Sequence, residues 1–156
     1  EAPKHEVFWD IESYDNLFIC GMLNENDFLE MFYLVNECDD KAVADIKRAC
    51  EESPYEYKMY DLSQDMERFA WHFEKRIPTG NKPTILSDWL GESTKPVTPK
   101  EDWYFGYNTL QYDIPMIDHL LELNIGNRLQ TTPQSIREYS NDLIERKVRF
   151  VDTSAY

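Results

Sequence analysis

Three stretches with β-strand character occupy the chain as far as Val35, and only short polar breaks separate them. The stretches are residues 6–12, 16–23 and 28–35, and they are rich in the aromatic and β-branched residues that favour strands. The breaks at residues 13–15 and 24–27 have the length and polarity of hairpin turns. We therefore predict that the chain starts with an antiparallel three-strand meander.

Strand and helix patterns alternate after the meander. Pro115 suits the first turn of the predicted helix 114–123. The prolines of residues 78–102 predict a loop there. The predicted fold class is therefore α/β, with a mixed β-sheet flanked by helices. The predicted elements are helix 39–52, strand 55–62, a helix capped by Ser63, strand 103–107, helix 114–123, a helix from Thr131 or Thr132 to about Arg146, and strand 147–156.

Two acidic residues, Asp10 and Glu12, stand at the end of the first predicted strand. The period of two in a strand turns both side chains to the same face. Two carboxylates on one face repel each other unless a cation lies between them. Oxygen ligands suit hard cations such as Mg²⁺ or Mn²⁺, and two such ions about 3.5–4 Å apart can catalyse phosphodiester hydrolysis. The pair therefore predicts a metal site, the alternative being two acids on a solvated strand face.

A second group of polar residues lies where the predicted strand 103–107 meets the helix after it. Asn108 and Asp113 stand at this junction, and Tyr112 directly precedes the aspartate. An amide and an aromatic ring can hold a frayed nucleic-acid strand by hydrogen bonding and stacking without reading its sequence. The alternative is that Tyr112 belongs to the core and Asn108 caps the helix.

These two segments resemble two motifs of one enzyme family. Asp10-Ile11-Glu12-Ser13 resembles an Asp-x-Glu motif followed by Thr or Ser, and Asn108 with Tyr112 and Asp113 resembles Asn-x-x-x-aromatic-Asp. Both motifs belong to the DEDD-type 3′-5′ exonucleases of the ribonuclease-H-like fold. The nearest resemblance is to the proofreading domains of family B and phage DNA polymerases.

The resemblance implies a role for each matching residue. Asp10, Glu12 and Asp113 would be the catalytic metal ligands and would hold two Mg²⁺ or Mn²⁺ ions. Ser13, Asn108 and Tyr112 would position the 3′-terminal nucleotides of a single-stranded DNA. The implied setting is DNA replication in a bacterial or viral, cytoplasmic context, with a polymerase domain as a partner in the same chain.

The third motif of this family has no match after Asp113. The family pattern there is Tyr-x-x-x-Asp or His-x-x-x-x-Asp, whereas Tyr139 and Asp142 are three residues apart. Asp152, close to the last residue Tyr156, resembles the strand that precedes this motif. We therefore expect residues 1–156 to form one exonuclease-like domain, truncated at its C-terminus, from a longer polymerase or nuclease.

The net charge keeps two other functions open. With 16 Lys and Arg against 30 Asp and Glu, the formal charge is −14, which disfavours a module that binds nucleic acid through a broad basic surface. A nuclease is less affected, because bound cations can carry the phosphate contacts. The alternatives are a 3′-5′ exoribonuclease, which tolerates the 2′-hydroxyl, and a non-catalytic ribonuclease-H-like interaction or scaffold domain.

Cysteine usage and hydropathy indicate the cellular setting. Cys20, Cys38 and Cys50 form no CxxC pair, which fits a reducing intracellular compartment. No apolar run approaches the ~20 residues needed to cross a bilayer. We therefore expect a soluble protein without a membrane partner.

Overall fold

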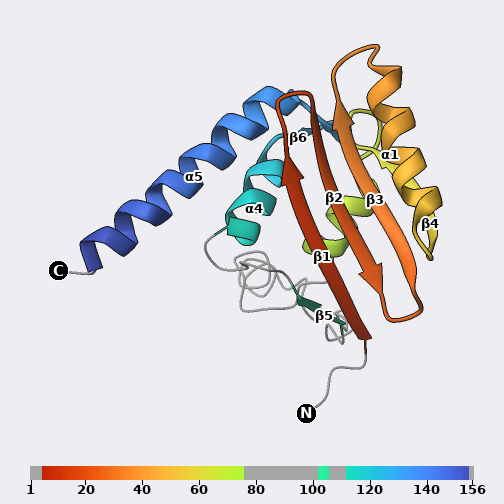
Figure 1. Ribbon diagram of the computed structural model, residues 1–156, viewed down its shortest axis with the longest axis horizontal. Coiled ribbons are helices and arrows are strands. Elements are labelled where there is room, and N and C mark those ends of the chain that lie inside the picture. The colour runs from red at the N-terminus through yellow and green to blue at the C-terminus, as the bar shows by residue number, and fades with distance from the viewer. Residues whose placement is uncertain (1–4, 76–101, 106–111, 155–156) are drawn as a thin grey trace, which may run out of the picture.

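The computed structural model describes residues 5–75, 102–105 and 112–154 of the chain, and Figure 1 shows its helices and strands. The described residues form an α/β structure with a mixed sheet, as predicted. The elements are β1 (His5–Ser13), β2 (Leu17–Asn24), β3 (Phe28–Val35), α1 (Asp40–Glu52), β4 (Glu56–Asp61), α2 (Glu67–Ala70), the π-helical turn η1 (Trp71–Lys75), β5 (Asp102–Phe105), α4 (Ile114–Glu122), β6 (Asn124–Ile125), β7 (Arg128–Leu129) and α5 (Pro133–Ser154).

The main sheet has five strands in the order β4-β3-β2-β1-β5. β1, β2 and β3 pair antiparallel, which confirms the predicted meander. β4 joins β3 in parallel at one edge, and β5 joins β1 in parallel at the other edge. β1, which carries the first acidic motif, therefore lies between an antiparallel and a parallel neighbour.

Side-chain hydrogen bonds fix the β2–β3 turn of the meander and the start of the helix that follows it. Asn24 Oδ1 accepts hydrogen bonds from the backbone N–H groups of Asn26 at 2.9 Å and Phe28 at 3.1 Å, which closes the β2–β3 hairpin. Asp39 Oδ1 accepts the N–H of Ala42 at 3.1 Å and caps α1. The predicted helix 39–52 is therefore present, with Asp39 as its N-cap.

The main hydrophobic core lies on one face of the sheet. There α2, η1, α4 and α5 pack their apolar side chains against alternate residues of the meander, and α2 and α4 lie behind the sheet in Figure 1. The strand residues in this core are Val7, Trp9, Ile11, Phe18, Cys20, Met22, Phe32 and Leu34. Helices cover this face. Because successive side chains of a strand point to opposite faces, the residues that alternate with these point to the other face.

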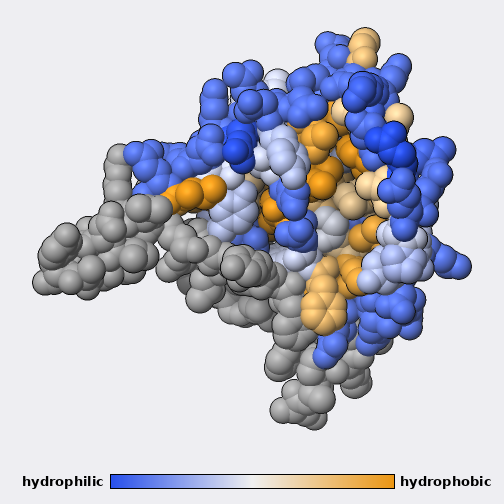
Figure 2. Space-filling model, viewed as in Figure 1, coloured by the Kyte–Doolittle hydropathy of each residue, from blue (hydrophilic) through white to orange (hydrophobic). Residues whose placement is uncertain are grey.

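The other face is only partly covered. α1 packs on β3 and β4 through a smaller cluster around Tyr33, Ile46 and Cys50. Within the described part of the chain, no helix covers β1 on this face, and β2 meets the α1 cluster only through the partly buried Ile19; both strands are visible in Figure 1. Figure 2 shows apolar side chains over the strands in the same view, between the polar surfaces of α1 and α5. We call the β1–β2 half of this face the open half-sheet.

Two of the predicted elements are wrong. The strand predicted for residues 147–156 is helical as far as Ser154, because α5 continues through it. No glycine or proline follows Pro133 in the chain, so nothing interrupts the helical hydrogen-bond ladder. Ser63 does not cap a helix. It donates to Asp61 Oδ1 at 2.6 Å in a turn, and α2 begins later, at Glu67.

A small hairpin and a ring stack connect the last helices. β6 and β7 pair around Gly126 and Asn127, whose φ angles are 64° and 63°, as a type I′ turn requires. The His119 ring of α4 stacks on Tyr139 of α5 with centroids 3.8 Å apart. No described helix is both long enough and apolar enough to cross a bilayer.

Candidate functional site

The first acidic pair lies on the open half-sheet. Asp10 pairs with Gly21 of β2 and Glu12 with Ile19, so both carboxylates emerge on the face opposite the main core. Asp10 is exposed and Glu12 is partly exposed. Gly21 has no side chain, and the side chains of Met31 and Leu29 lie 3.5 Å and 3.7 Å from where its Cβ would be. The shared face predicted from the strand period is therefore present, and solvent reaches it.

The surroundings of Asp10 disfavour its ionised form. Burial raises the pKa of Asp10 above its usual value, the charge of Glu12 raises it further, and a backbone hydrogen bond at Ile11 opposes the change. The ionised form of Asp10 is thus held in unfavourable surroundings. A cation between the two groups would reverse this effect, since an opposite charge favours ionisation.

A tyrosine and an arginine complete the end of β1. The Tyr14 hydroxyl donates a hydrogen bond to Glu12 Oε2. This bond, together with the charges of Glu12 and Asp10, raises the pKa of Tyr14, while Arg137 acts in the opposite direction. Arg137 also donates from Nη1 to the Ser13 carbonyl at 2.7 Å, and this contact attaches α5 to the end of the strand.

Ser13 lies on the other face of β1 from Asp10 and Glu12. Its side chain is 5% exposed, and its Oγ makes no hydrogen bond to any described residue. The strand alternation explains this placement, because Ser13 has the same parity as Ile11 and Trp9. The structure therefore does not bring the Ser13 hydroxyl to the acidic pair, and its contribution there is the backbone carbonyl held by Arg137.

The second motif reaches the sheet from the core side. Tyr112 packs against the main core, and its hydroxyl lies 2.7 Å from Ser140 Oγ of α5. Asp113 is 5% exposed and makes no side-chain cap to α4. Burial raises the pKa of the Cys20 thiol, and the charges of Asp113 and Asp10 raise it further. Both aspartates therefore act on the same residue of β2.

Asn108 lies outside the described residues, as do residues 78–101 of the predicted loop. Among the described residues, no three His, Cys, Asp or Glu side chains lie together as a metal-binding group. Asp10 and Glu12 alone still suit one hard cation, because Mg²⁺ typically takes one or two carboxylates and keeps several waters. The placement of both carboxylates on one solvent-accessible strand face is the structural observation that favours this fit.

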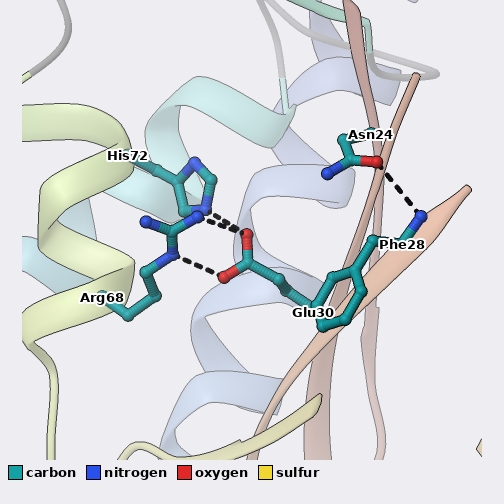
Figure 3. Close-up of polar contacts among 5 residues, drawn as sticks. All are labelled: Asn24, Phe28, Glu30, Arg68 and His72. Atoms are coloured by element: carbon teal, nitrogen blue, oxygen red, sulfur yellow. Dashed lines mark hydrogen bonds and ion pairs between the residues drawn. The ribbon is translucent and has the colours of Figure 1, made fainter. Parts of the chain in front are cut away.

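Another carboxylate of the sheet, Glu30 of β3, is buried on the core face among cationic partners (Figure 3). Arg68 of α2 donates to Glu30 from Nε at 2.5 Å and from Nη2 at 3.0 Å. His72 Nε2 of η1 lies 2.9 Å from the same carboxylate, and its side chain is 4% exposed. Burial alone would raise the pKa of Glu30, but hydrogen bonds and charge from His72 and Arg68 lower it to about 2.

A cavity of about 210 Å³ adjoins this cluster. Its walls come from the start of β1, the end of β2, the β2–β3 turn and the α2–η1 segment. The Arg68 guanidinium lies 4.0 Å from the centre of the Trp71 ring beside it. The cavity lies at the opposite end of β1 from Glu12, so the Glu30 cluster and the acidic pair are separate features of one sheet.

The Glu30 cluster was not predicted, although two patterns in the sequence indicate it. Glu30 has the same strand parity as Phe32 and Leu34, so an acid occupies a core-facing position. Such an acid needs a cationic partner. Arg68 and His72 are four residues apart, the spacing that places two side chains on one helix face. Phe8, Tyr14 and Arg137 were also missed as neighbours of the acidic pair.

No protein-family model, no curated protein and no solved structure matches this chain.

Proposed function

We propose that this chain is a ribonuclease-H-like domain that removes nucleotides from the 3′ end of a DNA strand with the help of divalent cations. The observation that carries the proposal is the pair of carboxylates on the open half-sheet. Asp10 and Glu12 share one face, solvent reaches them, and partial burial together with the charge of Glu12 raises the pKa of Asp10. Acids in this arrangement destabilise the empty site and favour a bound cation.

The strand order supports a contribution from Asp113. β5 lies parallel to β1, and Asp113 follows β5 at the start of α4. The carboxyl ends of adjacent parallel strands open at the same edge of a sheet, which is where ligands bind in α/β folds. Asp10 and Asp113 both act on the Cys20 thiol. Asp113 is buried on the core side, whereas the pair lies on the opposite face. We infer that Asp113 completes the ligand set through a rearrangement when a cation and substrate bind.

The residues around the pair suit the end of a nucleic-acid strand. Bound divalent cations would lower the pKa of an attacking water and stabilise the leaving oxygen. Asp10 and Glu12 would hold and orient them. Phe8 is on the same face, two residues before Asp10, and is 50% exposed. Its ring offers a surface on which a terminal base can stack, and stacking of this kind is tolerant of sequence.

The test combines metal binding with digestion of a 3′-labelled strand. Calorimetric titration with Mn²⁺ should detect binding to the unaltered chain and its loss in Asp10→Ala. Glu37→Gln is the matched control, because Glu37 is an exposed acid in the turn before α1. The unaltered chain and the control should shorten labelled single-stranded DNA from its 3′ end, and Asp10→Ala should not.

The other outcomes distinguish the rival functions. Faster shortening of labelled RNA than of DNA would replace the proposal with an exoribonuclease, which tolerates the 2′-hydroxyl. Single-strand binding that needs no metal and disappears with salt would indicate a non-catalytic scaffold. Absence of Mn²⁺ binding in the unaltered chain would overturn the proposal for these 156 residues.

A further inference from the structure

The Glu12 carboxylate has a partner at its outer end. Tyr14 follows two residues later, and its hydroxyl donates to Glu12 Oε2. The Tyr14 side chain is 47% exposed, so this contact lies at the surface of the site rather than in the core. A hydroxyl that donates to this oxygen occupies one of the positions from which a cation would approach it.

The backbone around Tyr14 is fixed from two sides. The Tyr14 N–H donates to the Leu17 carbonyl at 2.9 Å across the β1–β2 turn. The preceding carbonyl, that of Ser13, accepts from Arg137 of α5 at 2.7 Å. These two bonds hold the turn in place and present the Tyr14 hydroxyl to Glu12, and both involve backbone atoms of the turn rather than the Tyr14 ring.

We propose that the Tyr14 hydroxyl acts as a placeholder for the cation. It competes with the metal for the Glu12 carboxylate and moves away from that carboxylate when the metal binds. This inference rests on the proposed function, because it concerns the same metal site. Tyr14 is a positioning residue in this role, since it acts through Glu12. In the empty site its hydrogen bond partly satisfies Glu12, and that bond has to break before the oxygen can ligate a cation.

The placeholder predicts a gain of affinity when its hydroxyl is removed. A hydrogen bond to a charged group is stronger than one between neutral groups, although solvent weakens it at an exposed position. Tyr14→Phe should therefore tighten Mn²⁺ binding about three- to tenfold. A merely structural role for Tyr14 predicts the opposite, because a loosened strand end would weaken binding.

The experiment is calorimetric titration of Mn²⁺ into the unaltered chain, Tyr14→Phe and Tyr57→Phe. Tyr57 is the matched control, because its hydroxyl donates at 3.3 Å to Glu51, an acid of α1 outside the site. Tighter binding in Tyr14→Phe than in the unaltered chain, with no such gain in Tyr57→Phe, supports the placeholder.

The remaining outcomes separate the two proposals. Equal or weaker Mn²⁺ binding in Tyr14→Phe, with normal binding in the unaltered chain, overturns the placeholder and leaves the nuclease proposal intact. An equal gain of affinity in Tyr57→Phe also overturns it, because the effect would not depend on Glu12. No Mn²⁺ binding in any of the three proteins overturns both the metal site and the placeholder.

Discussion

Glu30 and Asp10 belong to one sheet but face opposite sides of it, and their surroundings shift their pKa values in opposite directions. Glu30 is buried, and Arg68 and His72 lower its pKa to about 2. Asp10 is exposed, yet burial of part of its carboxyl and the charge of Glu12 raise its pKa. The protein thus supplies cations to the carboxylate inside the core and a second anion to the carboxylate on the open half-sheet.

This difference separates a structural role from a functional one. The Glu30 carboxylate joins β3 to α2 and η1, and its ionised state stabilises the fold. Among the described residues no cationic side chain pairs with Asp10 or Glu12, and the ionised state of Asp10 carries a cost that a bound cation would relieve. Four changes test the contrast, and they follow in order of expected effect.

The largest effect is expected from Glu30→Ala. The substitution leaves Arg68 and the almost fully buried His72 without their shared carboxylate. Breaking a buried ion pair by removing one partner costs roughly 3–5 kcal/mol, and the partial exposure of Arg68 favours the lower value of about 3 kcal/mol. Urea unfolding measures the loss, with Glu37→Gln as a control that stays within about 0.5 kcal/mol of the unaltered chain. A loss below about 1 kcal/mol would remove Glu30 from its structural role.

The second prediction concerns the stability of the fold at low pH. The folded pKa of Glu30 is about 2, below its ordinary value of 4.5, so its contribution to stability is complete above pH 4.5 and is lost as the pH falls towards 2. We expect this contribution to be about 2 kcal/mol, after allowance for solvent around Arg68. The stability difference between the unaltered chain and Glu30→Gln should shrink steadily below pH 4.5. A difference that is independent of pH would show that the charge of Glu30 is unimportant.

The third prediction separates charge from geometry at the same cluster. Arg68→Lys keeps a positive charge but cannot reproduce the two bonds that Nε and Nη2 make to Glu30. It also removes the guanidinium plane from the Trp71 ring. We expect a loss of about 1 kcal/mol in the free energy of unfolding, less than for Glu30→Ala. An unchanged free energy would mean that charge alone satisfies Glu30.

The smallest change in stability, and of opposite sign, is expected at the acidic pair. Asp10→Asn removes the repulsion from Glu12, so the free energy of unfolding should rise by a few tenths of a kcal/mol at neutral pH. The folded pKa of Asp10 is raised, so this gain should fade as the pH drops and Asp10 takes up a proton. Thermal unfolding at two pH values measures it, and Mn²⁺ binding should be lost. A clear loss of stability would make Asp10 structural, like Glu30.

The sequence was sufficient to predict the meander and the shared strand face of Asp10 and Glu12. Both follow from a period of two that persists through β1, β2 and β3. The same rule places Ser13 on the opposite face from Glu12, so the family resemblance and the strand geometry point to different roles for Ser13.

Other features depend on contacts between distant parts of the chain. The contact of Arg137 with the Ser13 carbonyl has no local signal, because it joins α5 to β1. The coverage of β3 and β4 by α1, which leaves β1 and β2 open, depends on how the crossover to β4 packs. Residues 147–154 show the limit of short patterns, since a few alternating apolar residues fit a strand or the end of a long helix equally well.

The placement of β5 beside β1 bears on the order in which the molecule folds. Short turns join β1 to β2 and β2 to β3, so these strands are close in sequence. β5 pairs with β1 although a long stretch of chain separates the two strands. Contacts between residues distant in sequence carry a larger loop-closure entropy and form late. We expect the hairpins to form β1 early, which places Asp10 and Glu12 on one face. Asp113 would reach the sheet later, when β5 pairs with β1. The two carboxylates would then be neighbours before Asp113, the third ligand proposed above, reaches the sheet.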